Sequence, residues 1–286
     1  MKLLHVVRPH IVVGGFLGYV AGVLYGLNMG GATDWTGFIV GYLIVLFMDL
    51  STHFNNDYFD VEADKHAQFK PFGNKNIFLE HPELMNPSLY ASIASTTISL
   101  ALAALMLSIS SWQLLATTAL FNVLGWFYSA PPVKLSSRRL GEATIALGTG
   151  FCVPAVGYIV TMGMLTGVFL PFMVPLVLYG FVLSLCLQIP DYEVDREMGK
   201  NTIVGLIGRK KTYLLVSALC LVSSVFCLVF FNLKFGVLSL LPLLSSLWGL
   251  RLSNDHDDAK NYTKQVIITL FIYLIGLDVI LLLYLV

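Results

Sequence analysis

Residues 55–65 read Asn55-Asn56-Asp57-Tyr58-Phe59-Asp60-Val61-Glu62-Ala63-Asp64-Lys65 and follow a long apolar run. Four acids fall within eight positions of a chain in which only 12% of residues are charged. On a helix, Asp57, Asp60 and Asp64 share one face, because residues three or seven positions apart are stacked; Asn56 joins Asp60 by the four-residue spacing. Crowded carboxylates repel one another unless a cation lies between them. The stretch is therefore either a solvated acidic helix end or an oxygen-ligand site for a divalent cation such as Mg²⁺ with substrate phosphates.

The composition indicates an integral membrane protein. Of the 286 residues, 57% are hydrophobic, and the mean hydropathy is +0.78. Soluble domains contain about half apolar and about a quarter charged residues. The formal net charge is zero, so overall charge gives no reason to expect a nucleic-acid partner.

Nine apolar stretches are long enough to cross a bilayer, which takes about 17–25 helical residues. They lie near residues 9–28, 35–55, 88–109, 112–130, 142–163, 168–190, 211–232, 235–252 and 265–286. The predicted fold is all-α, a polytopic membrane protein with about nine transmembrane helices in a single domain covering residues 1–286.

The basic residues set the expected orientation. With the N-terminus in the cytoplasm, every Lys and Arg except Lys234 falls in a cytoplasmic segment, which is 16 of 17. Lys and Arg are concentrated in cytoplasmic loops of membrane proteins. We therefore expect a cytoplasmic N-terminus and a C-terminus on the far side. Fourteen of the 17 acids follow the same partition, whereas Asp49 and Asp278 fall within spans, where ionisable residues are often functional.

A second acidic motif follows the sixth stretch. Asp191 and Asp195 are four positions apart, as are Asp60 and Asp64, and each pair closes an even-numbered span on the same side. This correspondence predicts two tandem four-helix halves, about residues 1–140 and 141–262, plus a final helix at about 265–286. Two acidic clusters on one face of the membrane favour a metal-diphosphate site over two solvated helix ends.

Three elements in order resemble the UbiA superfamily of intramembrane prenyltransferases. The first combines the two aspartate motifs. The second is Tyr128-Ser129-Ala130-Pro131-Pro132-Val133-Lys134-Leu135, similar to the family's Tyr-Ser-x-Pro-Pro element. The third is Gly199-Lys200-Asn201-Thr202, similar to its Gly-Lys-x-Thr. The resemblance covers essentially the whole chain.

The resemblance implies Mg²⁺-dependent transfer of an isoprenyl chain from a polyprenyl diphosphate to an acceptor, often an aromatic ring, at a site facing the cytoplasm. The implied metal ligands are Asn56, Asp57, Asp60, Asp64, Asp191 and Asp195, with catalysis assigned to Asp60, Asp64, Asp191 and Asp195. Contacts to the diphosphate or to a substrate are assigned to Arg8, Asn56, Lys65, Tyr128, Lys134, Arg196 and Lys200.

Acceptor identity is left open by the sequence. Segments around both motifs, and Lys70-Pro71-Phe72-Gly73, resemble the branch that includes 1,4-dihydroxy-2-naphthoate prenyltransferases of menaquinone synthesis. Where that branch usually has Pro-Phe-Ser-Gly-Gly, this chain has Phe72-Gly73-Asn74-Lys75. The alternatives are a glycerol phosphate ether acceptor and a UbiA-type terpene cyclase. A secondary transporter is the alternative of a different class, although its charged site belongs near the bilayer midplane.

Two further residues have open interpretations. His53 lies one turn before Asp57, and is either a general base for the acceptor or a structural histidine with its hydrogen bonds satisfied. Arg8 opens the first span and either meets an acidic acceptor or anchors the helix at the interface.

Overall fold

The computed structural model describes residues 6–65, 76–252 and 255–286. The Lys70–Gly73 segment and Asn74-Lys75 therefore lie outside the described residues. The long helices are α1 (Pro9–Asn28), α2 (Trp35–Phe59), α4 (Met85–Leu105), α5 (Trp112–Ser129), α8 (Phe169–Gln188), α11 (Arg209–Phe230), α12 (Leu233–Leu247) and α13 (His256–Leu283). A ninth rod joins α6 (Gly141–Leu147), a π-helical turn at Gly148–Cys152 and α7 (Val153–Met162).

Short helices fill the connections between the long ones. They are α3 (Val61–Asp64), α9 (Tyr192–Glu197) and α10 (Ile203–Ile207), together with 3₁₀ turns at Ile77–Leu79, Pro82–Leu84, Met106–Ser108, Leu135–Ser137 and Trp248–Arg251. The described residues contain no β-strand, so the prediction of an all-α fold is confirmed for this part of the chain.

The spans agree closely with the apolar stretches. Eight helical segments in the described residues are long and apolar enough to cross a membrane. The stretch predicted at 112–130 is also helical as α5, but it is not among those eight. The number nine and the cytoplasmic N-terminus stay predictions. Two ends differ: α2 runs on to Phe59, and α13 begins at His256 because Asp255 caps its first turn by accepting from the amides of Asp257 and Asp258.

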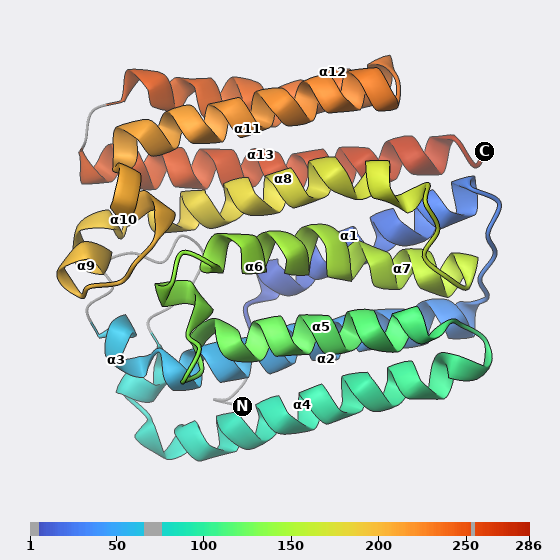
Figure 1. The fold of residues 1–286 in the computed structure, drawn as a ribbon, viewed down its shortest axis with the longest axis horizontal. Helices are drawn as coiled ribbons and strands as arrows, with labels where there is room; N and C mark the ends of the chain where they lie inside the picture. Colours follow the sequence, from blue (N-terminus) through green and yellow to red (C-terminus); the bar gives the residue numbers. More distant parts are fainter. Residues whose placement is uncertain (1–5, 66–75, 253–254) are drawn as a thin grey trace.

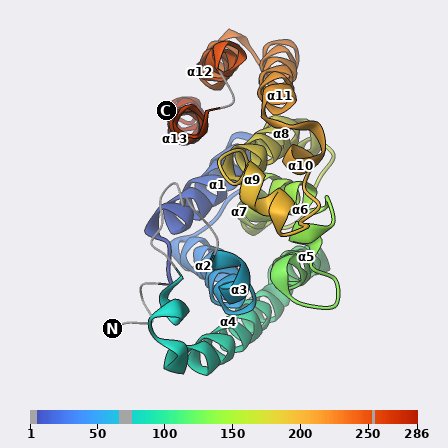
Figure 2. The same ribbon diagram turned by 90° about the vertical axis from the view of Figure 1, so that its left-hand side faces the viewer.

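The long helices run side by side, and their ends form two faces (Figure 1). The end-on view in Figure 2 shows them arranged around the molecule, with α4 and α12 far apart and α3, α9 and α10 at the end facing the viewer. Helix α13 lies against α1 although the two are at opposite ends of the chain, and the side chain of Asn28 donates to the carbonyl of Leu281.

Small residues bring helices into close contact. A Cβ added to Gly22 of α1 would lie 1.9 Å from the carbonyl oxygen of Pro154, and one added to Gly157 of α7 would lie 2.2 Å from that of Tyr19. Only glycine fits at these two backbone crossings. In lipid, where apolar burial gives little drive for helix association, such close packing is a main source of helix–helix attraction.

A serine row joins α4 to α2. Ser88, Ser92, Ser95 and Ser99 are all buried and recur every three or four positions along one face of α4. Ser92 donates to the carbonyl of Ser51 at 2.9 Å, and Ser88 donates to that of Phe54 at 3.1 Å. These interhelical hydrogen bonds hold the final turns of α2, which lead into the acidic stretch.

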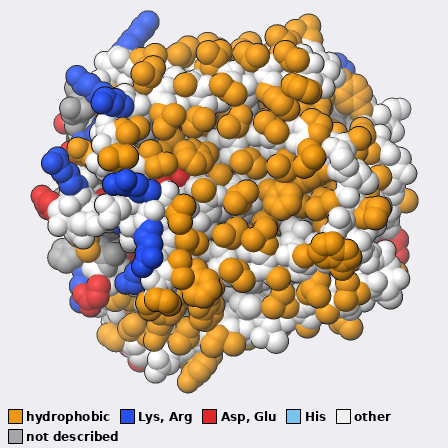
Figure 3. Space-filling view, viewed as in Figure 1, with side chains coloured by type: hydrophobic (Ala, Val, Ile, Leu, Met, Phe, Trp, Pro, Cys, Tyr) orange, Lys and Arg blue, Asp and Glu red, His pale blue; other side chains and the backbone are white. Residues whose placement is uncertain are grey.

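Charged side chains gather at the end that carries α9 and α10. Figure 3 shows Lys and Arg along that end, while hydrophobic side chains cover most of the remaining surface on this face. Helix α11 also exposes apolar residues, such as Leu221, Val225 and Leu228. An apolar belt with a charged end fits a multi-pass protein that exposes its polar loops at the membrane surface.

Candidate active site

The first acidic stretch is not one continuous helix. Helix α2 ends at Phe59, Asp60 adopts a non-helical conformation, and α3 begins at Val61. The aspartates consequently meet partners from different directions. Asp57 forms a 2.5 Å ion pair with Arg8, and Asp60 accepts a 2.6 Å hydrogen bond from Ser129 of α5.

Asn76 fixes the end of the stretch. Its side-chain amide donates to the carbonyl of Asp57 at 2.8 Å and to the carboxylate of Asp64 at 2.9 Å. Residues 57 and 64 are thereby joined across the bend at Asp60. The spacing predicted one continuous helical face. The structure instead has two helices joined by a bend at Asp60, and we call residues 57–64 the first acidic corner.

The second motif, residues 191–200, also bends sharply, and we call it the second acidic corner. Asp191 precedes α9, and Asp195 within this short helix is buried. The chain then turns at Gly199, where φ is +68°, and returns Lys200 to the motif. The Lys200 ammonium donates to the Asp195 carboxylate at 3.3 Å. Glycine allows this left-handed turn without the steric cost that a side chain would impose.

Lys200 joins the two motifs. It interacts electrostatically with Asp195, with Asp60 and with the Tyr128 hydroxyl. Burial disfavours the charged form of Lys200, but attraction by Asp195 and the other two groups outweighs it, so the pKa of Lys200 lies above its ordinary value. Three predicted site residues from separate regions of the sequence, Asp60, Tyr128 and Asp195, therefore lie within electrostatic range of Lys200, and Asp195 contacts it directly.

The two carboxylates around Lys200 carry a desolvation cost. Burial raises the pKa of Asp60, although the hydrogen bond from Ser129 and the charge of Lys200 partly offset it. Burial likewise raises the pKa of Asp195, and Lys200 again opposes the shift. Both acids are thus poorly solvated, and the positive charge of Lys200 favours their ionised form.

Backbone contacts align the loops that carry these residues. The Arg139 amide donates to the carbonyl of Asn201 at 2.8 Å, and the Asn201 amide donates to that of Ser137 at 3.3 Å. Glu142, buried at the start of α6, accepts from the amide of Ile203 at 2.8 Å. The segment after the Tyr128–Leu135 element is consequently docked to the Gly199–Thr202 element.

Arg209 holds the second motif from the other side. This residue begins α11, is only 3% exposed, and forms a bidentate ion pair with Glu193. It also donates to the carbonyls of Ile189 at 2.9 Å and Pro190 at 3.1 Å, and its guanidinium lies 5.6 Å from the ring centre of Tyr192. One side chain thus ties the end of α8 to α9.

Comparisons with known proteins identify the family of the chain. The model of the UbiA prenyltransferase family matches residues 16–275. The chain belongs to this family. It is therefore a UbiA prenyltransferase, an enzyme that transfers isoprenyl groups, and its bundle of long apolar helices is the fold of that family.

Individual relatives are distant. The 1,4-dihydroxy-2-naphthoate octaprenyltransferase of Bacillus subtilis (strain 168) is 20% identical over 211 residues, which make up 74% of this chain and 67% of that protein. A structure of digeranylgeranylglyceryl phosphate synthase has a TM-score of 0.69 at 18% identity and covers 96% of each chain. A UbiA homologue from Archaeoglobus fulgidus, bound to GPP and Mg²⁺, has a TM-score of 0.68 at 16% identity, covering 98% of this chain and 99% of the other.

The predicted basic residues of this UbiA prenyltransferase differ in their contacts and in their exposure. Lys200 reaches both motifs, whereas Lys65 pairs with Glu62 of the adjoining short helix at 2.6 Å. Lys134 and Arg196 are exposed. Arg8 pairs with Asp57 and so ties the start of α1 to the acidic stretch.

The protein's oxygen ligands fit Mg²⁺ in kind. Within residues 6–65, 76–252 and 255–286, no three His, Cys, Asp or Glu side chains are grouped so that they could hold a metal ion. Arg8, Ser129 and Lys200 engage the carboxylates instead. The donor set is nonetheless all oxygen, and the side-chain oxygen of Asn56 is buried with no hydrogen-bond partner in the described part of the chain. A hard cation prefers such ligands.

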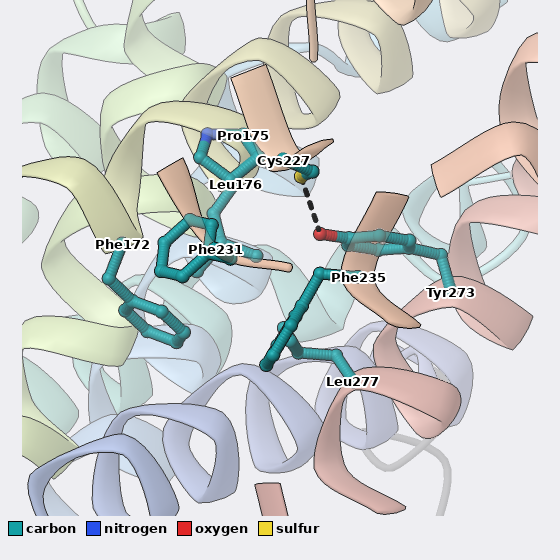
Figure 4. Close-up of a pocket in the computed structure, with 8 residues that line it drawn as sticks. All are labelled: Phe172, Pro175, Leu176, Cys227, Phe231, Phe235, Tyr273 and Leu277. Atoms are coloured by element: carbon teal, nitrogen blue, oxygen red, sulfur yellow. Dashed lines mark hydrogen bonds between the residues drawn. The ribbon is translucent and has the colours of Figure 1, made fainter. Parts of the chain in front are cut away.

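Two hollows lie outside the group of predicted site residues. The one in Figure 4 lies among α8, α11, α12 and α13, where the thiol of Cys227 and the hydroxyl of Tyr273 are 3.9 Å apart. Its volume is about 10 Å³, which is room for a single water at most. The other, about 260 Å³, lies beside Tyr192 and Arg209 at the charged end. Of these two, only the hollow at the charged end combines open volume with charged side chains.

Several residues of the site were not predicted. Ser129 and Glu193 lie inside stretches that were recognised, although no role was assigned to them, whereas Asn76, Glu142 and Arg209 had no distinguishing signal. Arg209 stands in the run Arg209-Lys210-Lys211, where positive charge alone is expected on topological grounds. The buried partners of these side chains come from other parts of the sequence.

Proposed function

We propose that this enzyme transfers an isoprenyl chain from a polyprenyl diphosphate to a hydroxylated aromatic acceptor in a Mg²⁺-dependent reaction at the cytoplasmic face. The observation that carries the proposal is the Lys200–Asp195 ion pair at 3.3 Å, with Asp60 and Tyr128 within electrostatic range of the same ammonium group. A diphosphate with its bound cations requires such an arrangement, in which carboxylates hold the metal and a lysine ammonium group holds phosphate oxygens.

Each motif has a role in this proposal. Asn56, Asp57, Asp60 and Asp64 on one side, and Asp191 and Asp195 on the other, would hold Mg²⁺. Bound Mg²⁺ would stabilise the negative charge that develops on the diphosphate as the allylic C–O bond ionises. Lys200 would turn from the carboxylates to phosphate oxygens, and the exposed Lys65, Lys134 and Arg196 would approach the diphosphate from the loop side.

The apolar interior supports the choice of substrate. The isoprenyl chain would lie among the long helices, where water is excluded and the developing allylic cation is protected from hydrolysis. The aromatic acceptor is favoured by the similarity to the naphthoate prenyltransferase of Bacillus subtilis. A glycerol phosphate ether acceptor is the second candidate, because of the similar fold of digeranylgeranylglyceryl phosphate synthase.

A reconstituted assay tests the proposal. Purified protein, Mg²⁺ and geranylgeranyl diphosphate are incubated with 1,4-dihydroxy-2-naphthoate or with geranylgeranylglyceryl phosphate, and products are identified by mass. We expect prenylated naphthoate, with no product when EDTA replaces Mg²⁺. Product from the glyceryl phosphate alone would transfer the assignment to the second candidate, and diphosphate release without any acceptor would favour cyclisation.

Two substitutions test the assignment of the acids. Asp60→Ala and Asp191→Ala should each abolish turnover while leaving the thermal stability in detergent close to that of the wild type. The matched control is Glu62→Ala, because Glu62 lies in the same stretch but pairs with exposed Lys65. Normal Mg²⁺-dependent turnover in both aspartate variants would reject the proposed metal site.

A further inference from the structure

One face of α2 carries a polar row toward α1. Two contacts fix its direction: Asp57 pairs with Arg8 at the start of α1, and the Asp49 carboxylate fills the space where a side chain at Gly15 would lie, 2.1 Å from the Cβ position. His53 is four residues from each of these acids and therefore lies on the same face, between the two contacts. Arg8 and His10 are near enough to act on its ring electrostatically.

His53 has no hydrogen-bond partner among the described residues. The residue is only 3% exposed, and both ring nitrogens are buried. Of the two interpretations open from the sequence, a satisfied structural histidine does not agree with this geometry. A buried donor or acceptor without a partner is destabilising, so a ligand that pairs with this ring would recover a substantial free energy.

Asp49 is the second unsatisfied group of the row. It is 7% exposed and forms no hydrogen bond or ion pair with the described residues, although the Tyr42 hydroxyl is within electrostatic range. Its carboxylate faces the interior of the bundle, against α1, and not the lipid. Acidic side chains that point inward from membrane segments commonly bind a substrate or relay a proton.

Asp49 and His53 together indicate which kind of ligand would bind between them. Residues four apart on a helix are separated by about 6 Å along its axis, so one aromatic ring carrying two hydroxyl groups can meet both. A hydroxyl can donate to Asp49, and it can donate to or accept from a neutral imidazole. Neither a buried carboxyl group nor a neutral imidazole supplies the cation that an ionised phosphate needs when it leaves water, which disfavours a glycerol phosphate at this position.

We propose that Asp49 and His53 form the subsite for the hydroxyl groups of the acceptor, and that His53 receives a hydroxyl proton during transfer. This inference rests on the proposed function. As the C1–O bond of the donor breaks and its electron pair leaves with the diphosphate, a ring carbon bonds to C1 and the hydroxyl proton passes to His53. The substituted carbon then loses its own proton, and the oxygen takes one back from His53, so that one proton is released overall.

The test separates acceptor effects from donor effects. His53→Gln, His53→Phe and Asp49→Asn are purified, and Mg²⁺-dependent binding of geranylgeranyl diphosphate is measured by calorimetry before turnover with 1,4-dihydroxy-2-naphthoate. We expect donor binding within about twofold of the wild type in all three. Turnover should fall about 100-fold or more in both His53 variants, as for loss of a general base. Glutamine should preserve the KM for the acceptor better than phenylalanine does, and Asp49→Asn should raise that KM about tenfold, the loss of roughly one hydrogen bond.

Asp278→Asn is the matched control, because Asp278 of α13 is also a buried acid whose carboxylate oxygens lack partners among the described residues. It should leave the acceptor KM unchanged. Wild-type turnover in both His53 variants would overturn the inference. Loss of donor binding together with turnover would also overturn it, because Asp49 and His53 would then belong to the donor site or be needed for folding. If the wild-type enzyme prenylates no aromatic acceptor, the proposed function fails separately. The subsite is then tested by equilibrium binding of dihydroxynaphthoate: weaker binding to Asp49→Asn than to the wild type supports it, and equal binding rejects it.

Discussion

Lys200 is a single positive charge shared by two acidic corners that lie more than a hundred residues apart in the chain. Its ammonium contacts Asp195 at 3.3 Å and acts electrostatically on Asp60, which favours the charged forms of these poorly solvated acids. We therefore propose that Lys200 contributes both to the stability of the site and to binding of the donor diphosphate.

Lys200→Met should raise the KM for geranylgeranyl diphosphate about 10- to 100-fold, because a hydrogen bond to a charged group contributes about 1.5–3 kcal/mol. Lys200→Arg should lie between methionine and wild type. Initial rates at saturating Mg²⁺ measure the effect. Lys260→Met, which removes a partly exposed lysine paired with Asp257, is the control; an equal loss in that variant would show that the effect is general surface charge.

At this scale the sequence identified the chemical groups but not their partners. Asp60, Asp195, Tyr128 and Lys200 were predicted because they stand in recognisable motifs, and in the structure the first three lie within electrostatic range of Lys200. That Asp60 accepts a hydrogen bond from Ser129, or that Asn76 spans Asp57 and Asp64, depends on how separate segments dock. No local pattern encodes such contacts.

At the scale of elements, the junction of α8, α9 and α11 depends on Arg209. Its planar guanidinium meets the Glu193 carboxylate and two backbone carbonyls at once, which a lysine ammonium cannot reproduce. The junction in turn sets the direction of Asp191 and Asp195. We therefore regard Arg209 as a positioning residue for the second motif.

Arg209→Lys should raise the Mg²⁺ concentration needed for half-maximal activity about tenfold, while kcat at saturating Mg²⁺ falls less. Arg209→Met leaves Glu193 without its partner and should also lower thermal stability, since breaking a buried ion pair costs about 3–5 kcal/mol. Glu193 is itself largely exposed, which will reduce that cost. Lys210→Met is the neighbouring exposed control. If Arg209→Lys has a wild-type Mg²⁺ dependence, the positioning role is wrong.

The serine row of α4 gives a stability prediction. Ser92→Leu forces a larger side chain between α4 and α2 and removes the hydrogen bond to Ser51, so it should destabilise the protein by about 1–3 kcal/mol. Thermal unfolding in detergent measures this. Thr97→Leu also replaces a hydroxyl by a leucine, but on the exposed face of α4, where the threonine donates only within its own helix, to the carbonyl of Ile93. It should have little effect, and equal melting temperatures for the two variants would contradict an interhelical role for the row.

The sequence predicted the elements well because a bilayer requires long apolar runs, and such runs are visible locally. Ends were less predictable. The polar first turns of α13 carry charges that resemble a loop, yet Asp255 caps them into the helix. The bend at Asp60 was also missed, since spacing alone cannot distinguish a continuous helix from two helices joined at a corner.

At the scale of the whole molecule, the charges divide the protein into a polar end and an apolar body (Figure 3). The positive-inside rule predicts that the polar end faces the cytoplasm. The number of spans decides where the C-terminus lies. With α5 as a ninth span the two termini are on opposite sides, and with eight they are on the same side.

Cysteine labelling in intact cells tests this topology. Lys234→Cys and Lys210→Cys replace exposed lysines near opposite ends of α11, and the four native cysteines are buried. A thiol reagent that cannot cross membranes should modify residue 234 directly and residue 210 only after permeabilisation. The reverse pattern would invert the orientation. A third variant, Val286→Cys, should be labelled like residue 234 if the spans number nine.

The division into two tandem halves stays a prediction, because it rests on the correspondence of two motifs and not on contacts. The one-sided placement of polar loops could be anticipated because charge must avoid lipid. The pairing of α1 with α13 could not, since residues at the two ends of a chain show no local sign that they will meet.

The hydrogen bond from the Arg139 amide to the carbonyl of Asn201 joins segments that are synthesised at different times. Lys200 leaves the ribosome 140 residues after Asp60, so the first acidic corner must enter the membrane assembly without its balancing cation. The corner is completed only when the second loop docks on the first. A chain cut in the connection between α7 and α8 keeps each corner on its own fragment, and activity should return only when both fragments are produced together in the same membrane.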